Sequence, residues 1–368
     1  MDKYIQKHAS VLLNYSLNLK KDEKIFIMGQ HISFPLMKEL YRQAIILGAF
    51  PECRFTDDEL QEIIFKNGND EQLKYVPESL KLSYEKSDAL LTVWGSANTR
   101  IFSDIMPEKI KKASRGKRPL LDILFQRIAR GEARWCGTLF PTRAIAQEAS
   151  MSLEDFQEFA RHAGFLNEDD PIAHWQEINR QQEKICRYLN KKSTIRIVAR
   201  DTDISLSIKD RKWINCSGKE NFPDGEVFTC PVEDSAQGHI RFSFPAIYEG
   251  REVEDIRLTL EKGKIVKATA GRGEDLLNEV LRTDEGSNFL GEVAIGTNYH
   301  IQRFSRDILF DEKIGGTCHV AVGRSFPEAG GKNESAIHWD MLCEMKNGGR
   351  IFVDELLIYQ DGKFIIEF

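Results

Sequence analysis

The stretch EKIFIMGQHISFPLMKELYRQAIILGAFPECRF, residues 23–55, contains the pattern that determines the fold class of the first half of the chain. EKIFIMGQ is a run typical of a buried strand, PLMKELYRQAIILGAF has helical spacing that ends at Gly48, and PECRF is again typical of a short strand. ALLTVWG, residues 89–95, predicts a further strand, with helices in between. This alternation predicts an α/β domain whose mostly parallel sheet is covered by helices.

Two further helical segments separate this region from the rest of the chain. Ser152 begins a signal similar to a capping box, S-L-E-D, which predicts the start of one helix. A second helix is expected over about residues 171–189, and the polar stretch NKKS follows it. We therefore predict an N-terminal domain over residues 1–192 and a second domain over residues 193–368.

The pattern changes in the second half of the chain. TIRIVA, TDISLSI, HIRFSF, DIRLTL and KIVKATA are short alternating segments separated by turn residues, as in a sheet of short strands. RIFVDELLIYQDGKFII predicts a hairpin that turns at Asp361 and Gly362. One helix, near residues 274–281, interrupts the strands. The second domain is therefore expected to be β-rich, of the α+β class.

The composition excludes several classes of protein. Hydrophobic residues make up 41% and charged residues 29% of the 368 residues, as in ordinary folded proteins. No apolar run approaches the roughly 18 residues that span a bilayer, and the N-terminal segment lacks a secretory signal, so we expect a cytoplasmic protein without membrane contact. The net charge of −6 without a long basic tract argues against nucleic acid as a partner. The seven scattered cysteines predict reduced thiols.

The segment ESAIHWDM, residues 334–341, places two polar side chains in an apolar strand. Because side chains alternate along a strand, His338 and Asp340 point to one face, whereas Trp339 and Met341 point to the other face, toward a core. Two interpretations of this pair remain open. The residues form an ordinary exposed strand face, or they are two ligands of a metal ion.

Further possible ligands occupy constrained positions in the same half. Glu226 in NFPDGEVFTCP and Glu292 in FLGEVAIGTN both follow a glycine, His319 lies in the strand GTCHVAVG, and LFDEK contains Asp311 and Glu312. Each residue alone is equally compatible with a solvated turn or a hydrogen-bonded core position. Together, two imidazoles and several carboxylates suit one or two divalent ions that activate water and polarise a carbonyl. Residue types alone thus indicate a metal-dependent hydrolase.

Several separated strings resemble the thermophilic metalloaminopeptidase family of the aminopeptidase T and aminopeptidase S type. The resemblance is dense over about residues 202–364, in the strings that begin NFPDGEVFTCP, RTDEGSNFLGEV and HVAVGRSFPEAGG, and it is thinner in WCGTLFPTRAIAQEASMSLEDFQEFA. It implies an α/β N-terminal domain, a β-rich metal-bearing domain and a homodimer. It also implies that the protein is an enzyme that removes single residues from the N-termini of peptides.

Carried over position by position, the resemblance implies a set of metal ligands for two divalent ions of the zinc, cobalt or manganese type. Glu292 is implied as the bridge between the ions, and the carboxylate that manages the proton is not identified. The implied ligands are Glu226, Glu292, Glu312, His319, His338 and Asp340.

One position departs from the family pattern. Phe326, in GRSFP, stands where the family usually has a tyrosine, and we expect it to lie at the substrate. Phenylalanine keeps the ring but lacks the hydroxyl that would donate to a developing oxyanion. Two alternatives to an aminopeptidase therefore remain open: a catalytically weak relative that binds peptides or metal, and a metallohydrolase of another amide.

Overall fold

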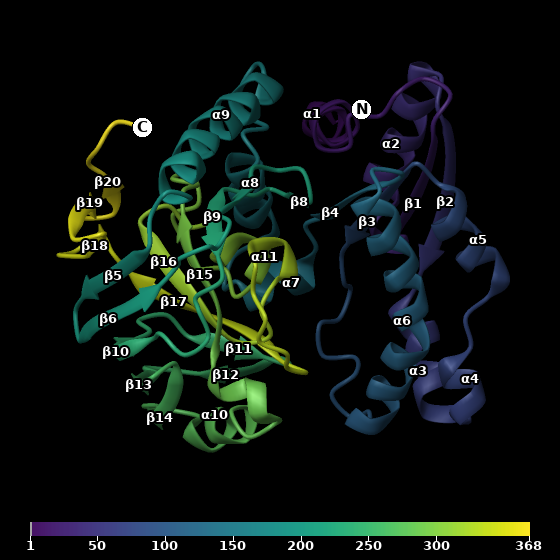
Figure 1. Ribbon diagram of the computed structural model, residues 1–368. Coiled ribbons are helices and arrows are strands. Elements are labelled where there is room, and N and C mark those ends of the chain that lie inside the picture. Colours follow the sequence, from purple (N-terminus) through teal and green to yellow (C-terminus); the bar gives the residue numbers. More distant parts are fainter. Residues whose placement is uncertain (1) are drawn as a thin grey trace. The chain divides into compact units, whose positions relative to one another are not determined.

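The computed structural model describes residues 2–368, which form two compact units (Figure 1). The N-terminal unit comprises the chain up to Ile172 together with Gly218–Pro223. The C-terminal unit comprises Ala173–Ser217 and Asp224–Phe368. The two units have the two architectures that the sequence predicts, and each is described by itself.

The N-terminal unit contains a five-stranded sheet with the strand order β2-β1-β3-β4-β8, in which every neighbouring pair is parallel. The predicted parallel sheet is confirmed. β8 was not expected here, because it comes from a segment more than eighty residues after β4 in the chain. The strands are β1 (Lys24–Gln30), β2 (Phe50–Thr56), β3 (Ala89–Trp94), β4 (Arg134–Leu139) and β8 (Asn221–Phe222).

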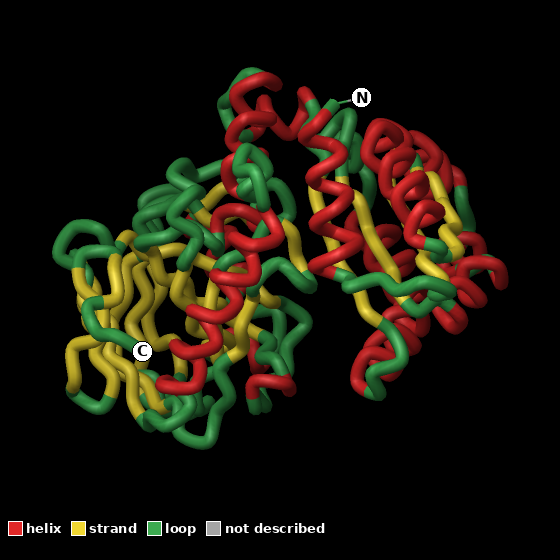
Figure 2. Tube along the Cα trace, turned by 90° about the horizontal axis from the view of Figure 1, so that it is seen from above, coloured by secondary structure: helices red, strands yellow, loops and turns green. Residues whose placement is uncertain are grey.

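Helices surround this sheet, as Figure 2 shows with helices and strands in different colours. α2 ends as the sequence predicts, because Gly48 adopts a left-handed conformation with φ 83° at the C-cap. Ser152 caps α8 by accepting a hydrogen bond from the amide of Asp155 at 3.0 Å. The helices are α1 (Lys3–Val11), which continues into a π-helical turn (Leu12–Ser16), α2 (Phe34–Leu47), α3 (Asp58–Asn67), α4 (Asp70–Lys74), α5 (Glu78–Lys86), α6 (Pro107–Ala129), α7 (Arg143–Glu148) and α8 (Leu153–Ala163), and a 3₁₀ turn (His31–Ser33) precedes α2.

We expect His8 of α1 to make the stability of the N-terminal unit depend on pH. Its Nε2 lies 2.8 Å from Oγ1 of Thr138, which in turn donates to the carbonyl of Phe222. Burial lowers the pKa of His8 from 6.5 to about 3. Below pH 6.5 the unfolded chain therefore binds a proton that the folded unit does not bind, and the free energy of unfolding falls as the pH is lowered toward 3.

We expect this effect to cost roughly 1–2 kcal/mol at about pH 4.5, after allowance for the partial exposure of the ring. Urea denaturation of the wild type and of His8→Gln at about pH 7.5 and pH 4.5 tests it. The variant should lose less stability on acidification than the wild type. An equal loss in both proteins would show that His8 is not the group responsible.

The larger sheet of the C-terminal unit is antiparallel throughout, with the order β14-β13-β10-β6-β5-β18-β19-β20. The predicted hairpin turn at Asp361 and Gly362 is confirmed between β19 and β20. The strands are β5 (Thr194–Ala199), β6 (Thr202–Ser207), β10 (Gln237–Arg241), β13 (Arg257–Glu261), β14 (Lys264–Thr269), β18 (Arg350–Val353), β19 (Leu356–Gln360) and β20 (Lys363–Phe364).

A second antiparallel sheet of five strands has the order β17-β16-β15-β9-β7. Its strands are β7 (Ile214–Cys216), β9 (Glu226–Thr229), β15 (Leu290–Gly296), β16 (Thr317–Gly323) and β17 (His338–Glu344). The remaining elements of this unit are the hairpin of β11 (Ala246–Tyr248) and β12 (Arg251–Val253), the helices α9 (Pro171–Leu189), α10 (Glu274–Val280) and α11 (Ile308–Asp311), and 3₁₀ turns at Glu285–Asn288 and Pro327–Ala329.

The two sheets of the C-terminal unit share one apolar core. Ile195 and Leu258 of the larger sheet and Val293, Val320 and Trp339 of the five-stranded sheet belong to the same buried cluster. Side chains that alternate with these residues in the five-stranded sheet point to the opposite face. That second face carries the polar residues predicted as ligands.

α9 contributes to the same core, since Ile185, Cys186 and Leu189 lie in the cluster. When the chain is divided into compact units, most of this helix accordingly belongs to the C-terminal unit. The predicted boundary between two domains, at residues 192 and 193, stays a prediction. Within the described part of the chain, no helix has both the length and the apolar character needed to cross a membrane, and no disulfide bond is present.

Candidate metal centre

Four adjacent strands of the five-stranded sheet bring five of the six predicted ligands to one face. Glu226 begins β9, Glu292 lies in β15, His319 in β16, and His338 and Asp340 in β17. The expected alternation is confirmed, because their neighbours Val227, Val293, Val320, Trp339 and Met341 point into the shared core. Residues far apart in the sequence therefore meet because they occupy the same face of neighbouring strands.

Small residues make room between these side chains. Ala321 of β16 pairs with Glu292 on one side and with Asp340 on the other, and Ala294 of β15 pairs with His319. A larger residue at Ala321 would fill the space between the two carboxylates. A bulge between Leu290 and Glu292 also interrupts the register of β15, and a bulge of this kind re-aims the adjacent side chain.

The ligand atoms form two overlapping groups. Nε2 of His319 lies 3.4 Å from both Glu226 Oε2 and Glu292 Oε1. Nε2 of His338 lies 3.3 Å from Glu292 Oε2 and 3.4 Å from Asp340 Oδ2. Within each group, Glu226–Glu292–His319 and Glu292–His338–Asp340, the ligand atoms all lie within 4.8 Å of one another. Glu292 is the residue that the two groups share.

Several of these atoms lack the hydrogen bonds that buried polar atoms normally make. Among residues 2–368, Glu226 Oε2, Asp340 Oδ1 and both ring nitrogens of His319 are buried without a hydrogen-bond partner. Nδ1 of His338 instead lies 2.7 Å from the carbonyl oxygen of Arg324, which leaves Nε2 to face the carboxylates. Such an outer partner orients histidines that bind metals. The donor set fits divalent ions of the zinc, cobalt or manganese type.

The electrostatic potential of the centre is strongly negative. Burial lowers the pKa of His319, but Glu292 and Glu226 more than offset this effect and raise it to about 9. Burial also lowers the pKa of His338, but Asp340 and Glu292 more than offset this effect and raise the pKa to about 12. The two imidazoles keep the pKa of Asp340 below its usual value despite burial. A potential that retains protons on imidazoles also attracts divalent cations, which displace those protons on binding.

The acidic residues of LFDEK are placed differently from one another. Glu312 follows α11 and lies beside the cluster, where burial, then the charges of Asp340 and Glu226, raise its pKa well above the usual value. It belongs to neither of the two groups. Asp311 accepts hydrogen bonds from the amide and the hydroxyl of Ser305, at 2.7 and 2.8 Å, and so serves the local fold. The role of Glu312 as a ligand stays a prediction.

Phe326 lies next to the centre. Its ring meets the imidazole of His338 edge-on at a centroid distance of 4.9 Å and contacts Phe228 at 5.3 Å. The side chain is half-buried. This placement is compatible with the predicted position at the substrate, but Phe326 has no polar group to offer there.

Lys313 is the residue of the centre that sequence reasoning missed. It is 1% exposed, its Nζ lies 2.8 Å from Glu226 Oε1, and it also donates to Glu312 Oε2. Burial lowers its pKa, but Glu226 and Glu312 more than offset this effect, so the pKa is raised. The available signal was its position directly after a predicted ligand in LFDEK.

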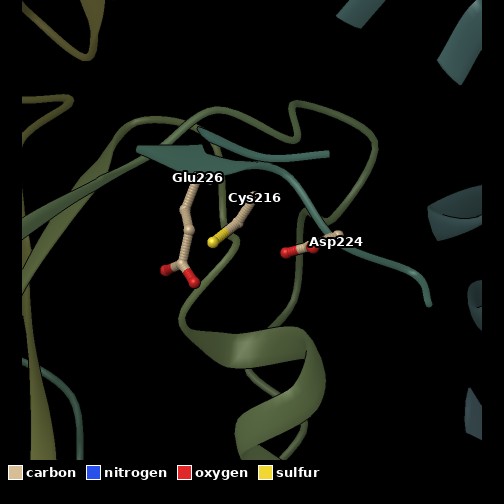
Figure 3. Close-up of side chains that lie close together, drawn as sticks. All are labelled: Cys216, Asp224 and Glu226. Carbon is tan, nitrogen blue, oxygen red and sulfur yellow. The ribbon is translucent and has the colours of Figure 1, made fainter. Parts of the chain in front are cut away.

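A third group of possible ligands lies next to Lys313. Cys216, Asp224 and Glu226 offer ligand atoms within 4.8 Å of one another, and Figure 3 shows their side chains converging beside the strand that carries Glu226. The charges of Asp224 and Cys216 both act on Lys313. The ammonium group of Lys313 is therefore a positive charge of the protein that interacts with this group.

The combination of an α/β unit with a β-rich unit that carries buried histidines and carboxylates is that of a metal-dependent hydrolase. The chain belongs to the thermophilic metalloprotease family M29, whose profile matches residues 1–364. It is therefore an enzyme that hydrolyses peptide bonds and that uses divalent metal, and the resemblance indicated by the sequence is confirmed.

Named relatives agree over nearly the whole chain. Aminopeptidase 2 of Geobacillus stearothermophilus is 26% identical over 93% of this chain and 92% of its own length. Aminopeptidase AmpS of Bacillus subtilis is 26% identical over 94% of each chain. The solved structure of wild-type AmpT from Thermus thermophilus superposes with a TM-score of 0.86 over 99% of both chains at 24% identity, which confirms the fold.

Proposed function

We propose that this metalloprotease is an aminopeptidase that releases single residues from the N-termini of peptides with the help of two divalent ions. The observation that carries the proposal is the pair of overlapping groups in which Glu292 takes part twice. Unpartnered atoms of Glu226, His319 and Asp340 support it. The names of the relatives support the preference for N-terminal residues. A bound ion of the zinc, cobalt or manganese type polarises a carbonyl group and lowers the pKa of a water molecule.

The side chains divide the work of binding and proton transfer. Five side chains would hold the ions, and Glu292 is common to both groups. They are Glu226, Glu292, His319, His338 and Asp340. Glu312 lies close to these ligands but in neither group, so we propose that its carboxylate takes a proton from the attacking water and returns it to the leaving amine. We also propose that the enzyme is a cytoplasmic homodimer, on the basis of the family resemblance alone.

A second candidate function rests on Phe326. Its ring lies against His338 without a hydroxyl group that could donate to the oxyanion of the transition state. A catalytically weak relative that binds peptides or metal is the corresponding candidate.

Metal removal tests the proposed function. After dialysis against 1,10-phenanthroline, we expect loss of metal together with loss of hydrolysis of a panel of aminoacyl p-nitroanilides, and recovery of both when zinc, cobalt or manganese is returned. The same substrates with an acetylated amine are the control, because an aminopeptidase requires the free N-terminus. Metal binding without turnover of any substrate would favour the weak relative. Neither metal nor turnover would contradict the proposal.

A further inference from the structure

Lys313 places a fixed positive charge inside the candidate centre. The side chain follows α11, is 1% exposed, and ends between two carboxylates, with Nζ 2.8 Å from Glu226 Oε1 and within hydrogen-bonding distance of Glu312 Oε2. A buried ammonium group is stable only when carboxylates pair with it in this way. The pairing engages Oε1 of Glu226 and leaves Oε2 as the oxygen of this carboxylate without a hydrogen-bond partner.

The two groups of ligands are therefore not equivalent. In the group Glu226–Glu292–His319, only Oε2 of Glu226 faces the histidine, at 3.4 Å, because Oε1 is engaged by Lys313. In the group Glu292–His338–Asp340, both acidic residues are clear of this ammonium. Among the described residues, neither Glu292 nor Asp340 forms an ion pair with a lysine or an arginine.

The position of the charge gives the same result. Nζ of Lys313 lies against Glu226, which belongs to only one of the two groups. Its repulsion therefore acts more strongly on an ion bound by Glu226, Glu292 and His319 than on an ion bound by Glu292, His338 and Asp340.

We infer that Lys313 acts as a built-in cation that makes the two metal positions unequal. The position formed by Glu292, His338 and Asp340 retains its ion, whereas the position formed by Glu226, Glu292 and His319 fills only at higher concentrations of free metal. The inference rests on the proposed function, since it concerns the same ions.

The number of bound zinc ions per chain, measured against buffered free zinc, tests the inference. The wild type should bind two ions in two separate steps. Lys313→Met keeps the length of the side chain without the charge, so the repulsion is lost and the weaker step should tighten by at least about tenfold while the tighter step changes little. Lys267→Met, at an exposed lysine of β14, is the matched control and should behave as the wild type does.

The outcomes separate the inference from the proposed function. Two ions bound with equal affinity by the wild type would overturn the inference, and this result does not depend on whether Lys313→Met folds. If a folded Lys313→Met protein binds the second ion with the same affinity as the wild type, the inference is also overturned. Lys313 would then have only a structural role, as part of an ion pair. If the wild type binds no zinc in this range and hydrolyses no aminoacyl substrate, the proposed function itself fails.

Discussion

Glu292→Gln should leave the protein without retained divalent metal after dialysis and reduce peptide hydrolysis by at least about a hundredfold. Glu292 is the residue common to both groups, and its two oxygens lie 3.3–3.4 Å from the two histidines. Replacing one oxygen by an amide group removes the negative charge that both positions share and one ligand atom from one of them. The substitution is nearly isosteric, so the packing of β15 should change little. Metal analysis and kcat/KM on aminoacyl p-nitroanilides provide the two measurements.

Asp311→Asn is the control for this experiment. Asp311 is as deeply buried as the ligands but accepts its hydrogen bonds from Ser305, outside the two groups. Its replacement should lower the melting temperature only slightly, because both hydrogen bonds go to Oδ1 and the amide oxygen of asparagine can accept them without the charge. The metal content should stay at the level of the wild type. Equal metal content in Glu292→Gln and the wild type would contradict the shared role of Glu292.

Phe326→Tyr should raise kcat on aminoacyl substrates by up to about a hundred- to a thousandfold, and metal content should not change. The ring already lies 4.9 Å from that of His338, and the side chain is half-buried, so an added hydroxyl needs little extra room. A hydrogen-bond donor to the oxyanion stabilises the transition state and not the bound substrate. The increase should therefore appear in kcat without a comparable fall in KM.

Phe364→Tyr, at a half-buried phenylalanine of β20 in the larger sheet, is the matched control and should leave kcat unchanged. If Phe326 only packs against Phe228, the new hydroxyl would be buried without a partner. A lower melting temperature with an unchanged or reduced kcat would then reject the role in catalysis. A large increase in kcat would favour the second candidate function, a catalytically weak relative of the active aminopeptidases.

Local patterns were sufficient to predict several elements of both units. Gly48 ends α2 as its helical spacing predicts, and the alternation in ESAIHWDM places Trp339 in the core and Asp340 on the opposite face. Both predictions depend on periods of 3.6 and 2 residues, which the chain displays without reference to distant partners. The family resemblance, and not these periods, supplied the identity of the ligand set.

Other features depend on contacts between distant parts of the chain. β8 pairs with β4, although β8 lies within the predicted second domain. The sequence did not predict this pairing, because a strand of two residues is too short to show a pattern of its own. The sequence by itself determined the two architectures and the shared strand face of His338 and Asp340. Only the tertiary structure decided that Lys313 enters the centre. A lysine is normally exposed, and its burial is stable here because the fold places Glu226 and Glu312 on either side of it.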